Sequence, residues 1–335
     1  MSQSAIKQEQ PTPLESLSSL LDEDMRQVNA VILDRMQSPV ALIPQLASYL
    51  IAAGGKRIRP LLTLACAQIF NADMDNVHKL AASVEFIHTA TLLHDDVVDE
   101  SLERRGKETA NLVFGNQASV LVGDFLFSRA FELMTETENV KVLKILANAS
   151  SIITQGEVLQ LSAMQNIDTS MNDYIEIITS KTAALFAASC EVGPVLADAS
   201  KEETQSFYDY GLYLGIAFQI ADDTLDYNAD AASLGKTVGD DFREGKITAP
   251  VLYALEAADE KERAFWQRTI AENNQKDGDL EKAQEIIARH NCIQKSHTLA
   301  ENYAQRAQEA LNSLPQNETA LLLKDLVSYT IQRKS

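Results

Sequence analysis

Two aspartate quintets of identical spacing, D-D-V-V-D at 95–99 and D-D-T-L-D at 222–226, stand in otherwise apolar stretches of the sequence. On a helix, the first and fifth residues of such a quintet lie one turn apart on the same face. Two unit charges about 6 Å apart repel each other by roughly 3 kcal/mol at an effective dielectric near 20. Solvated acidic helix surfaces are the alternative in a chain of net charge −19, but the repeated spacing favours a site for bound cations.

The six carboxylates of the quintets are the candidate metal ligands. They are Asp95, Asp96, Asp99, Asp222, Asp223 and Asp226. All are hard oxygen donors with no thiolate or imidazole cluster nearby, which favours Mg²⁺ or Mn²⁺ over zinc. Magnesium binds through one or two carboxylates together with substrate phosphates, so the pattern predicts a place for a diphosphate. A calcium loop is excluded because neither quintet has the required Asp-x-Asp-x-Asp-Gly pattern.

Basic residues cluster in two segments of this acidic chain. The segment G-G-K-R-I-R-P at 54–60 combines flexible glycines, three cations and a proline suited to the first turn of a helix, and it predicts an anion site. An exposed basic turn is the alternative. The segment R-R-G-K at 104–107 follows the first quintet by what would be two to three helical turns.

Further candidates surround these segments. Lys181, Lys236 and Lys246 are additional cations, and the Asp240-Asp241 pair serves either as outer support for the metals or as partners of lysines. His88 precedes Asp95 by two helical turns and points to the same cleft, although a structural histidine is the alternative. His94 faces away from Asp95 and is left out of the chemistry.

The elements that must position these residues are helices. Only 13 Gly and 8 Pro interrupt long stretches with apolar residues at three- and four-residue spacing, so the sequence predicts an all-α protein. Residues 1–13 are expected to form a flexible tail, 14–335 a single domain, and 228–246 a long polar loop. The expected helices are 14–36, 40–53, 60–71, 76–104, 117–135, 139–163, 172–198, 202–228, 247–257, 260–274, 279–290, 294–313 and 317–333.

Composition narrows the class of protein. The three cysteines, Cys66, Cys190 and Cys292, have no paired spacing, so we expect buried thiols. The acidic balance argues against a nucleic-acid partner, and no apolar run has the length of a transmembrane helix. Since the N-terminus also lacks a signal-peptide pattern, a cytoplasmic protein is expected.

Taken together, the motifs resemble those of the trans-isoprenyl diphosphate synthase family, most closely its bacterial long-chain, octaprenyl-type members. The resemblance covers nearly the whole chain from about residue 15. It rests on G-G-K-R-I-R-P, V-E-F-I-H-T-A-T-L-L-H-D-D-V-V-D-E-S, R-R-G-K, L-V-G-D-F, G-E-V-L-Q-L, S-K-T-A, F-Q-I-A-D-D-T-L-D-Y-N-A-D, L-G-K-T-V-G-D-D and E-G-K, in this order. A lone D-D-x-x-D would be weak, because terpene cyclases also carry it.

The resemblance implies an all-α bundle around a deep central cavity, usually as a homodimer. It implies addition of isopentenyl diphosphate to an allylic diphosphate, with farnesyl diphosphate as the expected primer, using three Mg²⁺. Asp95 and Asp99 would bind two ions and Asp222, with its neighbours, the third. The allylic diphosphate would be held by Arg104, Lys181, Thr182, Gln219, Lys236 and Lys246, and isopentenyl diphosphate by Lys56, Arg59, His88 and Arg105.

Product length is expected to depend on the residues before the first quintet. Family members that make short products often place a bulky aromatic residue there, whereas this chain has Ala90 and Thr91, which would let the tail extend toward Ile87. The expected product is therefore about octaprenyl diphosphate, for a quinone side chain. A shorter- or longer-chain synthase, a terpene cyclase and a non-catalytic synthase subunit are the alternatives. The cavity floor is expected at Leu133 and Met134 or on a partner subunit.

Overall fold

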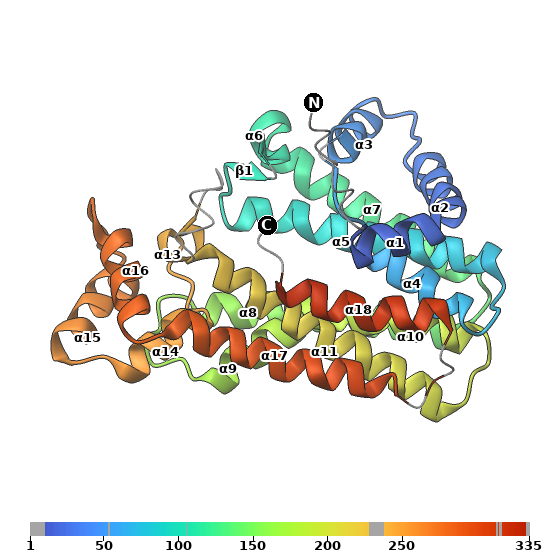
Figure 1. Ribbon diagram of the computed structural model, residues 1–335. Coiled ribbons are helices and arrows are strands. Elements are labelled where there is room, and N and C mark those ends of the chain that lie inside the picture. Colours follow the sequence, from blue (N-terminus) through green and yellow to red (C-terminus); the bar gives the residue numbers. More distant parts are fainter. Residues whose placement is uncertain are drawn as a thin grey trace, which may run out of the picture.

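The chain is almost entirely helical over residues 11–52, 54–104, 106–227, 238–312, 314 and 317–332, the residues that the computed structural model describes (Figure 1). The predicted all-α class is confirmed. None of the described helices combines the length and apolarity needed to cross a membrane. The helices are α1 (Pro13–Leu20), α2 (Asp22–Arg35), α3 (Leu42–Ala52), α4 (Ile58–Gln68), α5 (Met74–Val98), α6 (Ala110–Phe114), α7 (Asn116–Glu136), α8 (Val140–Ala163), α9 (Met171–Ile178), α10 (Ala184–Leu196), α11 (Lys201–Asp226), α13 (Asp240–Arg243), α14 (Ala249–Ala257), α15 (Glu260–Trp266), α16 (Asp279–Arg289), α17 (Cys292–Ala310) and α18 (Glu318–Gln332).

Local sequence explains where several of these helices begin. The Ser200 hydroxyl accepts a hydrogen bond from the backbone N–H of Glu203, and the Glu203 carboxylate accepts one from the backbone N–H of Ser200, so a capping box starts α11. Ser170 and Asp173 start α9 in the same way. The predicted helix over 14–36 is interrupted at Leu21, which separates α1 from α2.

Two long helices carry the quintets, and two apolar clusters surround them. Helix α5 packs on α7 and α4, and α11 packs on α10 and α17. The larger cluster joins α1, α2, α4, α5, α7, α8 and α10, while the smaller one lies around α14–α16 at one end of the molecule (Figure 1). Both α11 and α17 contribute residues to each cluster. The C-terminal ends of α5 and α11 are thereby brought to the same region.

The helix predicted over 76–104 ends early, and this is a correction to the sequence analysis. Helix α5 stops at Val98, and Glu100 takes a left-handed φ of 51° that a helix cannot continue. Strands β1 (Glu103–Arg104) and β2 (Lys107–Glu108) then form a small antiparallel hairpin. Its turn needs Gly106, whose φ is +74°. The R-R-G-K segment is thus a hairpin that folds back rather than a continuation of the helix.

A π-helical segment interrupts the helix predicted over 172–198. This segment, η1 (Thr179–Ala183), separates α9 from α10 and carries Lys181 and Thr182. Such single-turn π segments are frequent at functional sites. Gly156 of α8 lets η1 approach closely, since a Cβ at this position would lie 2.8 Å from the backbone nitrogen of Lys181. A second segment, η2 (Gln267–Ala271), ends the helix predicted over 260–274.

The remaining expectations concern the cysteines, the N-terminal tail and the polar loop. All three cysteines are free and buried, as predicted. Residues 1–10 of the expected tail and residues 228–237 of the expected loop lie outside the described residues. The later part of that loop contains the one-turn helix α13.

Candidate functional site

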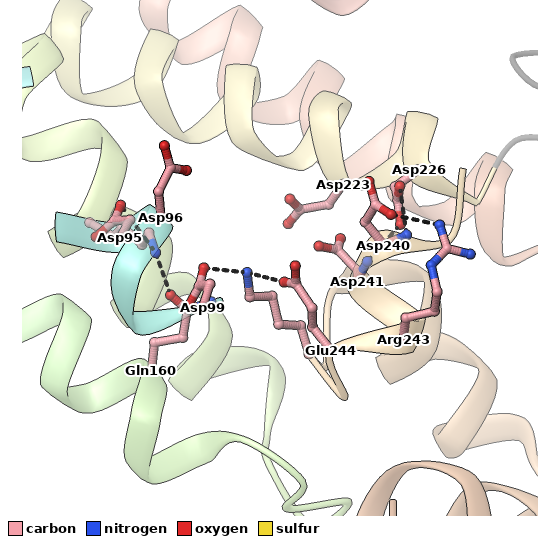
Figure 2. A network of polar contacts seen from close by, with 12 residues as sticks. Asp95, Asp96, Asp99, Gln160, Asp223, Asp226, Asp240, Asp241, Arg243 and Glu244 are labelled. Carbon is pink, nitrogen blue, oxygen red and sulfur yellow. Dashed lines mark hydrogen bonds and ion pairs between the residues drawn. The ribbon is translucent and has the colours of Figure 1, made fainter. Parts of the chain in front are cut away.

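The two quintets lie at the C-terminal ends of α5 and α11, which face each other across a cleft. Figure 2 shows Asp95 and Asp99 on one side and Asp223 and Asp226 on the other. Asp95 and Asp99 keep 16% and 19% of their side-chain surface exposed. Asp222 is the exposed member of the second quintet, whereas its neighbour Asp223 is buried.

Two lysines, one from η1 and one that follows α13, contact the first quintet. The Lys181 ammonium lies 2.7 Å from Glu157 Oε2 and 3.8 Å from Asp95 Oδ2. It also donates to Gln160 Oε1 at 2.8 Å. A phosphate held at Asp95 through a metal would therefore lie within reach of this lysine.

Lys246 makes the corresponding contact with the other carboxylate of the pair. Its Nζ lies 3.0 Å from Asp99 Oδ2 and also contacts Glu244. Burial lowers the pKa of this ammonium, but Asp99 and Glu244 outweigh the burial and raise the pKa above its ordinary value. Lys246 is thus a fixed cation at the cleft.

Burial also affects the first carboxylate. It raises the pKa of Asp95, with Lys181 opposing the rise and Asp99 adding to it. A divalent cation would relieve both the burial cost and the repulsion between Asp95 and Asp99.

Asp96 points away from the partners of Asp95 and Asp99. Its carboxylate is buried and its Oδ1 accepts two hydrogen bonds from Arg104, at 2.8 Å from Nε and 2.6 Å from Nη2. The hairpin turns Arg104 back to make this contact. Asp96 therefore orients the Arg104 guanidinium.

Asp226 is engaged by backbone donors. Its carboxylate accepts from the backbone nitrogens of Gly239 and Asp241 at 3.1 and 3.0 Å, and that of Asp240 is 3.3 Å away. The second quintet is thereby joined to the start of α13.

Asp223 belongs to a buried chain of side-chain hydrogen bonds. Its Oδ2 accepts from the Tyr174 hydroxyl at 2.6 Å and its Oδ1 accepts from Gln219 Nε2 at 2.7 Å. Gln219 Oε1 accepts in turn from the Thr182 hydroxyl at 2.7 Å. The six predicted ligands therefore differ in their surroundings. Asp95 and Asp99 are partly exposed beside lysines, Asp222 is exposed, and Asp96, Asp223 and Asp226 accept hydrogen bonds from arginine, tyrosine, glutamine or backbone donors.

Two of the four residues predicted to bind isopentenyl diphosphate, Arg59 and His88, lie together beside α5. Arg59 Nη1 lies 3.1 Å from His88 Nε2, and its guanidinium lies 4.5 Å from the centre of the Phe186 ring. Lys56 is exposed nearby in the chain. Gly54, His88 and Arg104 line a common pocket, so the G-G-K-R-I-R-P segment and the hairpin meet there. Arg105 and Lys236 lie outside the described residues.

An apolar cavity of about 250 Å³ begins at the first quintet. Asp95 and Asp99 lie at one part of its wall, and Thr91, Phe127 and Ile153 line another. Ala90 and Ile87 are fully buried in the packing around α5, as are Leu133 and Met134 on α7. Of the predicted chain-length residues, Thr91 is the one that lines this cavity.

His94 packs against α7 and also lines the apolar cavity beside Asp95, which corrects its exclusion from the site in the sequence analysis. Its Nε2 is 3.2 Å from the Val120 carbonyl oxygen, and a Cβ on Gly123 would collide with the ring.

The structure adds residues that the sequence analysis did not assign. These are Glu157, Gln160, Tyr174 and Glu244. Glu157 and Gln160 lie within the G-E-V-L-Q-L motif at helical spacing, which could have marked them as partners of a cation. Tyr174 carries no comparable signal in the sequence.

The donors suit a hard divalent cation. Within the described ranges no three His, Cys, Asp or Glu side chains converge on one point. Asp95 and Asp99 instead offer a pair of oxygen donors one turn apart, and magnesium completes its shell with water and substrate phosphate. The site fits Mg²⁺ bound together with a diphosphate.

Comparison with known proteins gives a consistent result over most of the chain. The polyprenyl synthetase family model matches residues 40–287. Octaprenyl diphosphate synthase of Escherichia coli (strain K12) is 45% identical over 320 residues, which cover 96% of this chain and 99% of that protein.

Two crystal structures are closely similar. A decaprenyl diphosphate synthase from Rhodobacter capsulatus is 51% identical with a TM-score of 0.93, over 96% of this chain and 100% of that one. A polyprenyl synthase from Caulobacter crescentus CB15, complexed with calcium and isoprenyl diphosphate, is 50% identical with a TM-score of 0.93, over 98% and 100%.

Proposed function

This chain belongs to the polyprenyl synthetase family, and from that premise we propose that it is a long-chain trans-prenyltransferase that adds isopentenyl diphosphate units to an allylic diphosphate. The proposed product is about octaprenyl diphosphate, as the name of the Escherichia coli relative suggests. The proposed primer is farnesyl diphosphate, and the product would supply a ubiquinone side chain.

The observation that carries this proposal is the presence of two cationic groups around one carboxylate cleft. Lys181 and Lys246 contact Asp95 and Asp99 directly. Arg59 of α4 and His88, which precedes Asp95 by two turns of α5, form a separate pair. Two diphosphate positions are what a condensation needs, whereas a terpene cyclase binds a single diphosphate. Both quintets are also complete, unlike those expected in a non-catalytic subunit.

We assign the metal-binding role to Asp95 and Asp99, which are partly exposed beside the two lysines, and to Asp222, the exposed member of the second quintet. Family members in general need divalent metal ions, and we propose three Mg²⁺, for which Mn²⁺ can substitute. Bound there, the metal supplies Lewis-acid neutralisation of the diphosphate. Asp96, Asp223 and Asp226 would support the site through the donors that they hold.

The chain's own side chains would then act on the leaving group and the reacting carbon. Lys181, Lys246 and Arg104 would donate hydrogen bonds to the diphosphate as its bond to the allylic carbon breaks, where preorganised charge contributes most. The isopentenyl double bond forms the new carbon–carbon bond. The released pyrophosphate takes the proton lost from the condensation product, so no side-chain base is needed.

A homodimer is the proposed assembly. Large apolar side chains stay exposed on α7 and α8, among them Leu121 at 67%, Val158 at 59% and Leu161 at 51%. Exposed apolar groups of this size on adjacent helices favour contact with another protein surface. The proposed location of the assembly is the cytoplasm, by resemblance to the octaprenyl-type enzymes.

The direct test is a condensation assay. Purified protein is incubated with radiolabelled isopentenyl diphosphate, farnesyl diphosphate and magnesium, and the products are separated by chain length. A ladder that ends near octaprenyl diphosphate is expected. Release of a cyclised hydrocarbon, or absence of label incorporation, would contradict the proposal.

Substitutions in the two groups of cationic residues are expected to affect KM for different substrates. Arg59→Ala should raise KM for isopentenyl diphosphate by about 10- to 150-fold, since a hydrogen bond to a charged group contributes roughly 1.5 to 3 kcal/mol. Its effect on KM for the allylic substrate should be much smaller. Lys181→Ala should show the reverse pattern, so each variant is the control for the other in steady-state kinetics. Equal changes in both constants would show that the two sites are assigned wrongly.

A further inference from the structure

Tyr174 is a buried residue beside the site that the reaction described above does not use. It comes from α9 and is 2% exposed. Together with Lys181, Thr182 and Gln219 it lines a cavity of about 120 Å³. Its hydroxyl donates to Asp223 and also has a hydrogen bond with the backbone of Ala249.

The chain of hydrogen bonds from Tyr174 to Thr182 has a fixed direction. An ionised carboxylate only accepts, so Asp223 requires a donor from both Tyr174 and Gln219. Gln219 must therefore turn its Nε2 toward Asp223 and its Oε1 toward Thr182. The Thr182 hydroxyl proton is then committed to Gln219, and the oxygen lone pairs are left for the cavity.

Tyr174 and Gln219 together supply one donor to each oxygen of the buried Asp223 carboxylate. Without the Tyr174 hydroxyl, one buried oxygen of Asp223 loses its donor. The Asp223 carboxylate is then no longer held in place, so it no longer fixes the orientation of the Gln219 amide.

We propose that Tyr174 is a positioning residue for the condensation: acting through Asp223 and Gln219, it makes Thr182 present oxygen lone pairs, rather than a proton, to the reacting allylic carbon. The inference rests on the proposed function, because positive charge develops at that carbon as the diphosphate departs. A lone pair stabilises such a carbon, and a hydroxyl proton pointed at it would not.

The test compares Tyr174→Phe with Tyr210→Phe. Tyr210 is also a fully buried tyrosine, and its hydroxyl donates to the Leu323 carbonyl oxygen at 2.9 Å, away from the cleft. We expect kcat at pH 8 to fall about 10- to 100-fold in Tyr174→Phe and less than twofold in Tyr210→Phe, the range typical of lost supporting contacts. Both KM values should change by less than about threefold.

A binding measurement separates positioning from metal or substrate binding. Calorimetric titration with farnesyl thiodiphosphate and magnesium should give the same affinity for wild type and Tyr174→Phe, within about threefold. Weakening of this affinity in proportion to kcat would overturn the inference, because Tyr174 would then support ground-state binding.

Combining Tyr174→Phe with Thr182→Val tests whether Tyr174 acts through Thr182. If Tyr174 acts through Thr182, Tyr174→Phe should lower the residual label incorporation of Thr182→Val by less than about twofold. Independent, multiplicative effects would overturn the inference. Wild-type protein that fails to elongate the substrate would contradict the proposed function, whereas elongation by wild type with equal kcat in the two tyrosine variants contradicts this inference alone.

Discussion

Asp95→Asn and Asp222→Asn are each expected to lower kcat by about a thousandfold or more, because each removes charge that a bound metal needs while the diphosphate departs. The two residues come from different helices, α5 and α11, and each lies in the last turns of its helix. Asparagine keeps the volume of the side chain, so the loss should appear in turnover and not in folding. Label incorporation with saturating substrates measures the effect, and circular dichroism checks the fold.

The control for this prediction lies on the same helix. Asp75 is exposed in the first turn of α5, at the opposite end from Asp95, and Asp75→Asn should keep wild-type turnover. EDTA should abolish turnover of the wild type, and either Mg²⁺ or Mn²⁺ should restore it. Near-normal kcat in both Asp95→Asn and Asp222→Asn would contradict the assignment of these residues as metal ligands.

The sequence could predict the helices and the two quintets because both depend on local spacing. Helical periodicity placed α8 and α11 within a few residues of their observed bounds. It could not predict the hairpin, since helix propensity continues past Val98 and only Glu100 and Gly106 mark the reversal. The π segment η1 also has no signature of its own, because it depends on the close approach of Gly156.

The partners of the carboxylates were harder to predict than the carboxylates themselves. The six aspartates are equivalent in the sequence pattern but not in the structure, because neighbours such as Asp222 and Asp223 differ in burial and in hydrogen-bond donors. The donor to Asp223 comes from Tyr174, on a helix far away in the chain. Side-chain pairs of this kind are set by tertiary packing and not by spacing within one helix.

Thr91→Tyr is expected to shorten the product to about C20 from farnesyl diphosphate, or about C15 from geranyl diphosphate, because the added ring would fill part of a close-packed channel that cannot yield without strain. Thr91 lines the apolar cavity that begins at Asp95, with Phe127 and Ile153 in its wall. The quintets and both cationic groups stay unchanged, so the first condensations should persist. Chromatography of the labelled products gives the chain length, and incorporation from geranyl diphosphate gives the rate of the first step.

Ala90→Phe addresses the same expectation less directly. Ala90 is fully buried among the packed side chains around α5, so a ring there meets the core before it meets the tail, and lost stability would accompany a shorter product. Thr91→Val is therefore the matched control, because it removes the hydroxyl without adding volume and should leave the product unchanged. Full-length product from Thr91→Tyr would mean that the tail follows another face of α5. A product that shortens with the ring and not with valine would identify volume at this one position as the factor that limits elongation.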